Sequence, residues 1–116
     1  MIKKLNILFR TSGGSARNKD LGMGHIFRCI NLASHLKIHN LFFLIEDYGK
    51  VESTIKNYGF QNITCLPKNL DLKLDTSTTI DFIEKKSIDI IIVDKYDVDK
   101  FFIKSLHKKQ KTVCIS

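Results

Sequence analysis

Short apolar runs alternate along this chain with segments in which apolar residues recur at helical spacing. The clearest run, residues 88–93, reads IDIIIV, and residues 40–45 read NLFFLI with no alternation of apolar and polar positions. A strand that is covered on both faces has this character, whereas a half-exposed strand alternates. These runs, with residues 4–10, 61–66 and 112–116, predict five strands, of which the last is expected to be buried.

The segments between the runs predict helices. In residues 24–39, Ile26, Cys29, Ile30, Ala33 and Leu36 recur three or four positions apart, which is the pattern of an amphipathic helix. Similar spacing predicts helices at 49–58, 76–86 and in a segment that ends near 109, while 11–24 and 68–75 are expected to be loops. Strands that alternate with helices predict an α/β fold, a doubly wound parallel sheet of the Rossmann-like kind. Ligands of such sheets lie beyond the carboxyl ends of the strands, here at residues 10–25 and 94–97.

Composition narrows the class of protein. The 116 residues suffice for a single domain. No apolar run approaches the length of a membrane span, and no signal peptide is recognisable, so we expect a cytoplasmic protein. Three cysteines without a C-x-x-C pair predict neither a disulfide framework nor a metal site, and we expect all three to be small buried side chains.

Positive charge is concentrated at the N-terminal end of the chain. The net charge is +7, and the first 37 residues hold seven basic residues and one acidic residue, a balance of +6. This field suits an anionic ligand such as a phosphate. A nucleic-acid partner is not expected, because no aromatic residues are interleaved with the basic ones there.

The segment that leads into the first helix holds the main candidate site. Gly22 and Gly24 flank the turn, where backbone N–H groups and the helix dipole favour an anion. A dinucleotide fingerprint would need a third glycine where Phe27 stands, and the P-loop pattern is absent, so no cofactor is expected. His25 lies in the first helical turn, where the dipole disfavours imidazolium; it serves either as a general base or as a group that orders the loop.

Other polar residues are expected around His25. Arg10 is placed at the rim of the site, and Arg28, one helical turn after His25, would hold a phosphate or carboxylate or pair with Asp20. Asp94 ends the fourth predicted strand and either takes part in chemistry or orders its loop. Tyr96 would stack on or hydrogen-bond to a sugar.

Taken together, these residues resemble a known family. The UDP-sugar hydrolases of pseudaminic acid biosynthesis, and the related spore-coat polysaccharide and flagellin-modification proteins, carry a similar order of glycine, histidine and arginine. Here it is Phe9, Arg10, Gly13, Gly14, Gly22, Gly24, His25, Arg28, Cys29, Leu32 and Ala33. The later Asp94-Lys-Tyr96 is similar to that family's Asp-x-Tyr, and the likeness runs through essentially the whole chain.

The resemblance implies the sugar-side, N-terminal half of a two-domain enzyme with a GT-B-like architecture. Such an enzyme hydrolyses a UDP-linked diacetamido-trideoxyhexose at the anomeric carbon, without a metal or cofactor, for nonulosonic acid and surface polysaccharide biosynthesis. His25 would then activate water, and the substrate-binding residues would be Arg10, Gly13, Gly14, Gly22, Gly24, Arg28, Asp94 and Tyr96. The basic segment between Gly14 and Gly22 is longer than the resemblance leads us to expect.

Two other functions remain open on the sequence. One is the acceptor-binding domain or subunit of a glycosyltransferase, and the other is a non-catalytic remnant that binds a sugar or an anion. Because the chain stops within its last predicted strand, we expect a second α/β domain or a partner chain to complete the protein and to hold most of the UDP.

Overall fold

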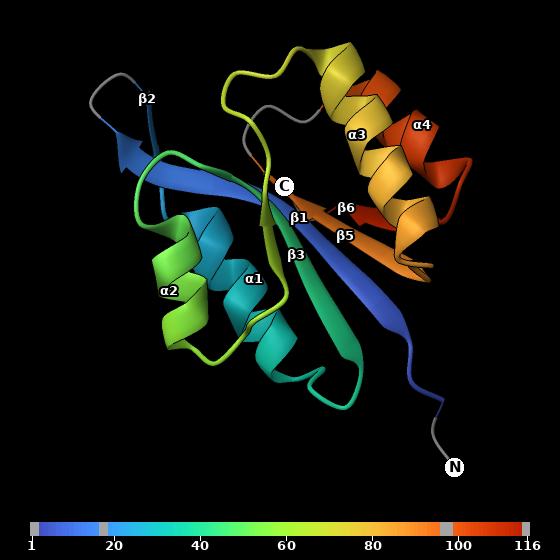
Figure 1. Cartoon of the computed structure of the whole chain (residues 1–116), viewed down its shortest axis with the longest axis horizontal. Coiled ribbons are helices and arrows are strands. Elements are labelled where there is room, and N and C mark those ends of the chain that lie inside the picture. The colour runs from blue at the N-terminus through green and yellow to red at the C-terminus, as the bar shows by residue number, and fades with distance from the viewer. Residues whose placement is uncertain (1–2, 17–18, 96–98, 115–116) are drawn as a thin grey trace.

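The computed structural model describes residues 3–16, 19–95 and 99–114; the side chains of residues 15–21 are not included in the description. Five parallel strands form the sheet in the order β4-β3-β1-β5-β6 (Figure 1). Their bounds are β1 Asn6–Ala16, β3 Asn40–Asp47, β4 Ile63–Cys65, β5 Ile90–Asp94 and β6 Lys111–Cys114. This is the predicted doubly wound α/β fold.

Two helices cover each face of the sheet. The helices α1 (Gly24–Ser34) and α2 (Val51–Asn57) pack on one face, and α3 (Leu72–Lys85) and α4 (Lys100–His107) pack on the other (Figure 1). A hydrophobic core lies on each face of the sheet. Successive residues of β1 pack into opposite cores, because side chains alternate across a strand. Ile7 and Phe9 are buried against α1 and α2, and Leu8 is buried against α3 and α4.

The chain reverses its direction across the sheet next to β1. From β1 it moves outward through β3 to β4 and then returns to β5 and β6 on the other side of β1. The carboxyl ends of β1 and β5 therefore border the switch in strand order, where ligands of open α/β sheets bind. The register pairs Thr11 of β1 with Asp94 of β5 at this edge.

The expected loop at 11–24 is wrong. The first strand continues through Ala16 and pairs with an antiparallel strand β2 (Lys19–Gly22), so that a hairpin extends beyond the sheet (Figure 1). Tertiary pairing overrides the glycine signal: Gly13 pairs with Asp47 of β3, and its carbonyl oxygen accepts from the Tyr48 N–H at 3.0 Å.

Several other boundaries differ from prediction. Helix α3 begins at Leu72, inside the expected loop at 68–75, because the Asp71 carboxylate accepts from the Leu74 N–H at 2.8 Å and caps the helix. Helix α1 ends at Ser34 rather than near 39. The strand β6 lies at the sheet edge and is largely exposed, so the expectation of a buried fifth strand is also wrong.

None of the described helices combines the length and the apolar character needed to cross a bilayer.

Candidate functional site

A histidine, an arginine and an aspartate meet at the switch point. His25 and Arg28 come from the first turns of α1, and Asp94 is the last residue of β5. His25 Nδ1 lies 2.7 Å from Asp94 Oδ1, and Arg28 reaches the same carboxylate with Nε at 2.5 Å from Oδ2 and an amino nitrogen at 2.6 Å from Oδ1. A spacing of three residues places both α1 side chains on one helical face, so that they converge on one acceptor.

Burial differs sharply among these three residues. The Asp94 side chain is fully buried, His25 is 20% exposed and Arg28 is 50% exposed. Burial would raise the pKa of Asp94, but hydrogen bonds from Arg28 and His25, together with the charge of Arg28, outweigh it and keep that pKa below its ordinary value. The same pairing raises the pKa of Arg28. The carboxylate is therefore an anion with all its partners in place.

The contact with Asp94 fixes the tautomer of His25. An ionised carboxylate only accepts hydrogen bonds, so a contact of 2.7 Å requires a proton on Nδ1. The amino nitrogen of Arg28 lies farther from Nδ1, at 3.2 Å, and donates to Asp94 instead. A neutral His25 then presents the Nε2 lone pair, to which no group among the described residues is bonded. This is the arrangement in which a histidine accepts a proton and a carboxylate orients it.

The start of α1 adds a positive field to the same edge. Its N-cap residue, Met23, makes no side-chain cap hydrogen bond, and no acidic residue lies in the first turn of the described helix. The first N–H groups of a helix lack intrahelical partners and attract anions. The glycine of this turn, Gly24, is exposed, and an added Cβ at Gly22 or Gly24 would meet no atom of the described residues within 4 Å. These two predicted site glycines therefore border open space beside His25.

The other two predicted site glycines do not. Both Gly13 and Gly14 are buried within β1. A Cβ at Gly13 would lie 2.7 Å from the Ile26 side chain, and one at Gly14 would lie 2.4 Å from the carbonyl carbon of Tyr48. At φ +125°, Gly14 also has a backbone conformation that L side chains rarely adopt. They serve close packing between β1, α1 and the β3–α2 turn, so the prediction that they line the substrate cleft is wrong.

The prediction that Arg10 lies at the rim of the site is wrong, because β1 continues for six residues beyond it. Its side chain is fully buried on the α3 face, where one amino nitrogen bonds to Glu46 at 2.7 Å and to Asp75 at 2.9 Å. Lys95 completes the cluster at 3.1 Å from Asp75. We call these four residues, Arg10, Glu46, Asp75 and Lys95, the buried ion cluster; its formal charges sum to zero.

Apart from Arg10, no member of this cluster was predicted as a site residue. Asp75 fell in the expected loop, and Lys95 was passed over between Asp94 and Tyr96. A signal for Asp75 exists, since Asp75, Thr76, Thr79 and Ile83 are buried residues three or four positions apart on one face of α3. The expectation for Tyr96 lies outside the described residues, as does a pairing of Arg28 with the Asp20 side chain; in the described part, Arg28 pairs with Asp94.

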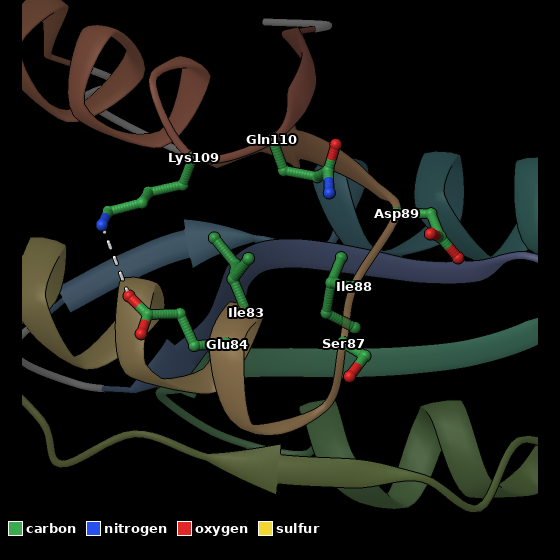
Figure 2. Close-up of a pocket in the computed structure, with 7 residues that line it drawn as sticks. All are labelled: Ile83, Glu84, Ser87, Ile88, Asp89, Lys109 and Gln110. Atoms are coloured by element: carbon green, nitrogen blue, oxygen red, sulfur yellow. Dashed lines mark ion pairs between the residues drawn. The ribbon is translucent and has the colours of Figure 1, made fainter.

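Hollows in the surface occur at both edges of the sheet. One of about 390 Å³ lies at the carboxyl ends of β3 and β4 and is lined by Asp47, Gly49, Lys50, Cys65, Leu66 and Lys68. Another of about 300 Å³ lies at the amino ends of β5 and β6, remote from His25, with Glu84 and Lys109 paired at 3.5 Å across its mouth (Figure 2). Only the first of these two is on the edge that carries His25.

The hollow at the carboxyl edge also holds a group with possible metal ligands. Ligand atoms of Asp47, Glu52 and Cys65 lie within 4.8 Å of one another. The Asp47 carboxylate already accepts from the N–H groups of Gly49, Val51 and Glu52 at 2.8–3.1 Å and so fixes the start of α2. The arrangement therefore has a structural explanation.

The cysteine expectation holds for one residue of the three. Cys29 is a buried residue of α1, whereas Cys65 and Cys114 are exposed at the sheet edges. Burial raises the pKa of Cys29 to about 12.

Comparisons with known proteins name no function for the chain. It is similar to the uncharacterized protein MJ1062 of Methanocaldococcus jannaschii, with 26% identity over 92 residues. That match covers 77% of this chain but only 17% of the archaeal protein, so the chain spans about a sixth of its relative's length. No protein-family model matches the chain, and no solved structure matches it.

Proposed function

We propose that this chain is the catalytic, sugar-side part of a nucleotide-sugar hydrolase, with His25 as the water-activating base. The observation that carries the proposal is the contact of 2.7 Å between His25 Nδ1 and the buried Asp94 carboxylate at the switch point of the sheet. It leaves Nε2 as the basic atom on a partly exposed ring, beside a helix N-terminus that no side chain in the described part of the chain caps and that suits a diphosphate.

The substrate class comes from the sequence resemblance, and the site is compatible with its chemistry. The proposed substrate is a UDP-linked diacetamido-trideoxyhexose. The oxygen of a water molecule bonds to the anomeric carbon as the bond from that carbon to the β-phosphate oxygen breaks. UDP leaves with the electron pair of that bond, and Nε2 of His25 takes a proton from the water. A second α/β domain or partner chain would bind most of the UDP.

The proposal is tested by UDP release from this sugar nucleotide, measured on the natural full-length protein. We expect His25→Asn to lower the rate by about 10²–10⁴-fold, the usual contribution of a positioned base, without loss of folding. His35→Asn is the matched control, because His35 is exposed at the end of α1 and its ring contacts the Asn31 carbonyl of the same helix at 2.9 Å. Wild-type turnover by His25→Asn would remove the base assignment.

A sugar acceptor in the same assay separates hydrolysis from transfer. Free sugar and UDP in equal amounts support the hydrolase proposal. A sugar–acceptor product would contradict it and would indicate a glycosyltransferase that uses the same histidine. If wild type and variant both bind the sugar nucleotide without turnover, the hydrolase proposal fails and the protein is a non-catalytic binding module.

A further inference from the structure

Arg28 holds the Asp94 carboxylate more completely than any other group does. It donates one hydrogen bond to each carboxylate oxygen, at 2.5 and 2.6 Å, in the fork geometry that only a guanidinium provides. Half of the Arg28 side chain is exposed, whereas Asp94 is fully buried. The arginine therefore closes the carboxylate off from water on the side that faces the site.

This contact decides which residue balances the charge of Asp94. A buried carboxylate needs one positive partner, since an unpaired buried charge is strongly destabilising. Two groups among the described residues can supply that charge: Arg28, which is always protonated, and His25, which is charged only when it binds a second proton. The buried thiol of Cys29, which interacts electrostatically with Asp94 and Arg28, stays neutral, because burial raises its pKa to about 12.

We propose that Arg28 is a positioning residue that neutralises Asp94 and thereby leaves His25 uncharged, with its proton on Nδ1 and its Nε2 able to accept another. With arginine present, the three side chains carry charges of +1, −1 and 0, and the set is neutral. Without arginine, neutrality requires an imidazolium at His25, which has no lone pair to offer to water. The consequence for catalysis rests on the proposed function, but the charge assignment does not.

The obvious competing role for Arg28 is direct contact with a substrate anion. In that role, its loss would weaken substrate binding, seen as a higher KM, and would leave His25 as it was. In the role proposed here, its loss changes the proton count of His25 before any substrate is present. The two roles therefore differ in a measurement on the protein alone.

That measurement is the nitrogen-15 NMR spectrum of the imidazole rings, recorded slightly above neutral pH. We expect wild type to show His25 with one proton, on Nδ1. Arg28→Gln is expected to show protons on both nitrogens, and Arg28→Lys, which keeps the charge, is expected to return His25 to one proton. Lys104→Gln is the control for loss of one positive charge, because Lys104 is exposed on α4, across the sheet from His25.

Wild-type His25 with two protons, or with its single proton on Nε2, would overturn the proposal without any variant. An unchanged His25 signal in Arg28→Gln would do the same. The double variant Arg28→Gln/Asp94→Asn removes the buried charge together with its partner, so we expect it to restore a single proton.

UDP release then separates this proposal from the proposed function. We expect Arg28→Gln to lose kcat near neutral pH and to recover part of it as the pH rises and His25 loses its extra proton. If the NMR result is as expected but no form of the protein releases UDP, the charge assignment stands and the hydrolase proposal fails. If wild type releases UDP and Arg28→Gln has a wild-type His25 signal, the hydrolase stands and the positioning role fails.

Discussion

Replacing Arg10 with methionine tests whether the buried ion cluster holds the fold together or serves the substrate. Methionine has a similar reach and no charge, so the substitution removes the hydrogen bonds to Glu46 and Asp75 at 2.7 and 2.9 Å without opening a large cavity. Among the described residues, the two carboxylates then keep one charged partner, Lys95, at 3.8 and 3.1 Å, together with hydrogen bonds from the hydroxyl groups of Tyr48 to Glu46 and of Thr79 to Asp75. Breaking a buried ion pair on one side costs about 3–5 kcal/mol of stability, and the remaining lysine places the expected loss near 3 kcal/mol.

The loss should depend on pH in a defined direction. Burial raises the pKa of Asp75, but the charges and hydrogen bonds of Arg10 and Lys95 outweigh it and lower that pKa below its ordinary value. A carboxyl with a lowered pKa in the folded state stabilises the protein above its unfolded pKa, near 4, and this contribution is lost as the pH falls through the folded pKa. Arg10→Met forfeits part of it at neutral pH, so the gap from wild type should narrow below about pH 4.

Urea unfolding followed by circular dichroism, at neutral pH and near pH 3, measures both effects. Lys104→Met, a loss of one exposed positive charge, is the control and is expected to change stability by no more than about 0.5 kcal/mol. A loss below about 1 kcal/mol at neutral pH, or a gap that widens in acid, would refute the reasoning. Lower activity with unchanged stability would instead indicate that Arg10 serves the substrate rather than the fold.

Three further predictions concern other positions. Asp94→Asn should cut UDP release by about 10³–10⁴-fold, because an amide donor at this position favours the His25 tautomer that cannot act as a base; activity within tenfold of wild type would contradict this. Gly14→Ala should lower the free energy of unfolding by at least about 2 kcal/mol, because Gly14 has a φ of +125° and an added Cβ would overlap with neighbouring backbone. In the same urea titration, Gly24→Ala should leave stability nearly unchanged, because its Cβ would meet open space among the described residues. A disulfide reagent should label the two exposed cysteines of the native protein and reach Cys29 only on unfolding; early reaction of Cys29 would show that α1 opens.

The five parallel strands and their order along the chain could be predicted because each coincides with a short apolar run between helical segments, whereas the antiparallel β2 could not. The continuation of β1 could not. Residues 11–16 read TSGGSA, which is turn-like locally, and they become a strand because the end of β3 supplies partners as far as Gly13. Where β3 ends, the register shifts between Gly14 and Ser15 and the hairpin begins. Glycine in this segment therefore marks close backbone packing rather than a loop.

The site could be predicted in part, for a related reason. Spacing along one helix placed His25 and Arg28 together, and strand polarity placed Asp94 at the same edge. Partners across the sheet were not visible, because nothing in the residues around Arg10 identifies Asp75, 65 positions later, as its acceptor. An arginine in an apolar strand predicts that some carboxylate is buried with it, but only the fold says which one.

Two consecutive residues at the end of β5 belong to the two polar groups at this edge, Asp94 to the group with His25 and Arg28, and Lys95 to the buried ion cluster. Asp94 faces α1, where His25 and Arg28 bind it, and the next residue, Lys95, faces α3 and α4, where it pairs with Asp75 and lies 4.9 Å from the ring centroid of Phe102. Consecutive residues of a strand point to opposite faces, so one short peptide is held on both sides. A rotation of this peptide that moved Asp94 away from His25 would also break the ion pairs of Lys95. The buried ion cluster therefore contributes to the site without touching it, because it fixes the backbone from which Asp94 reaches His25.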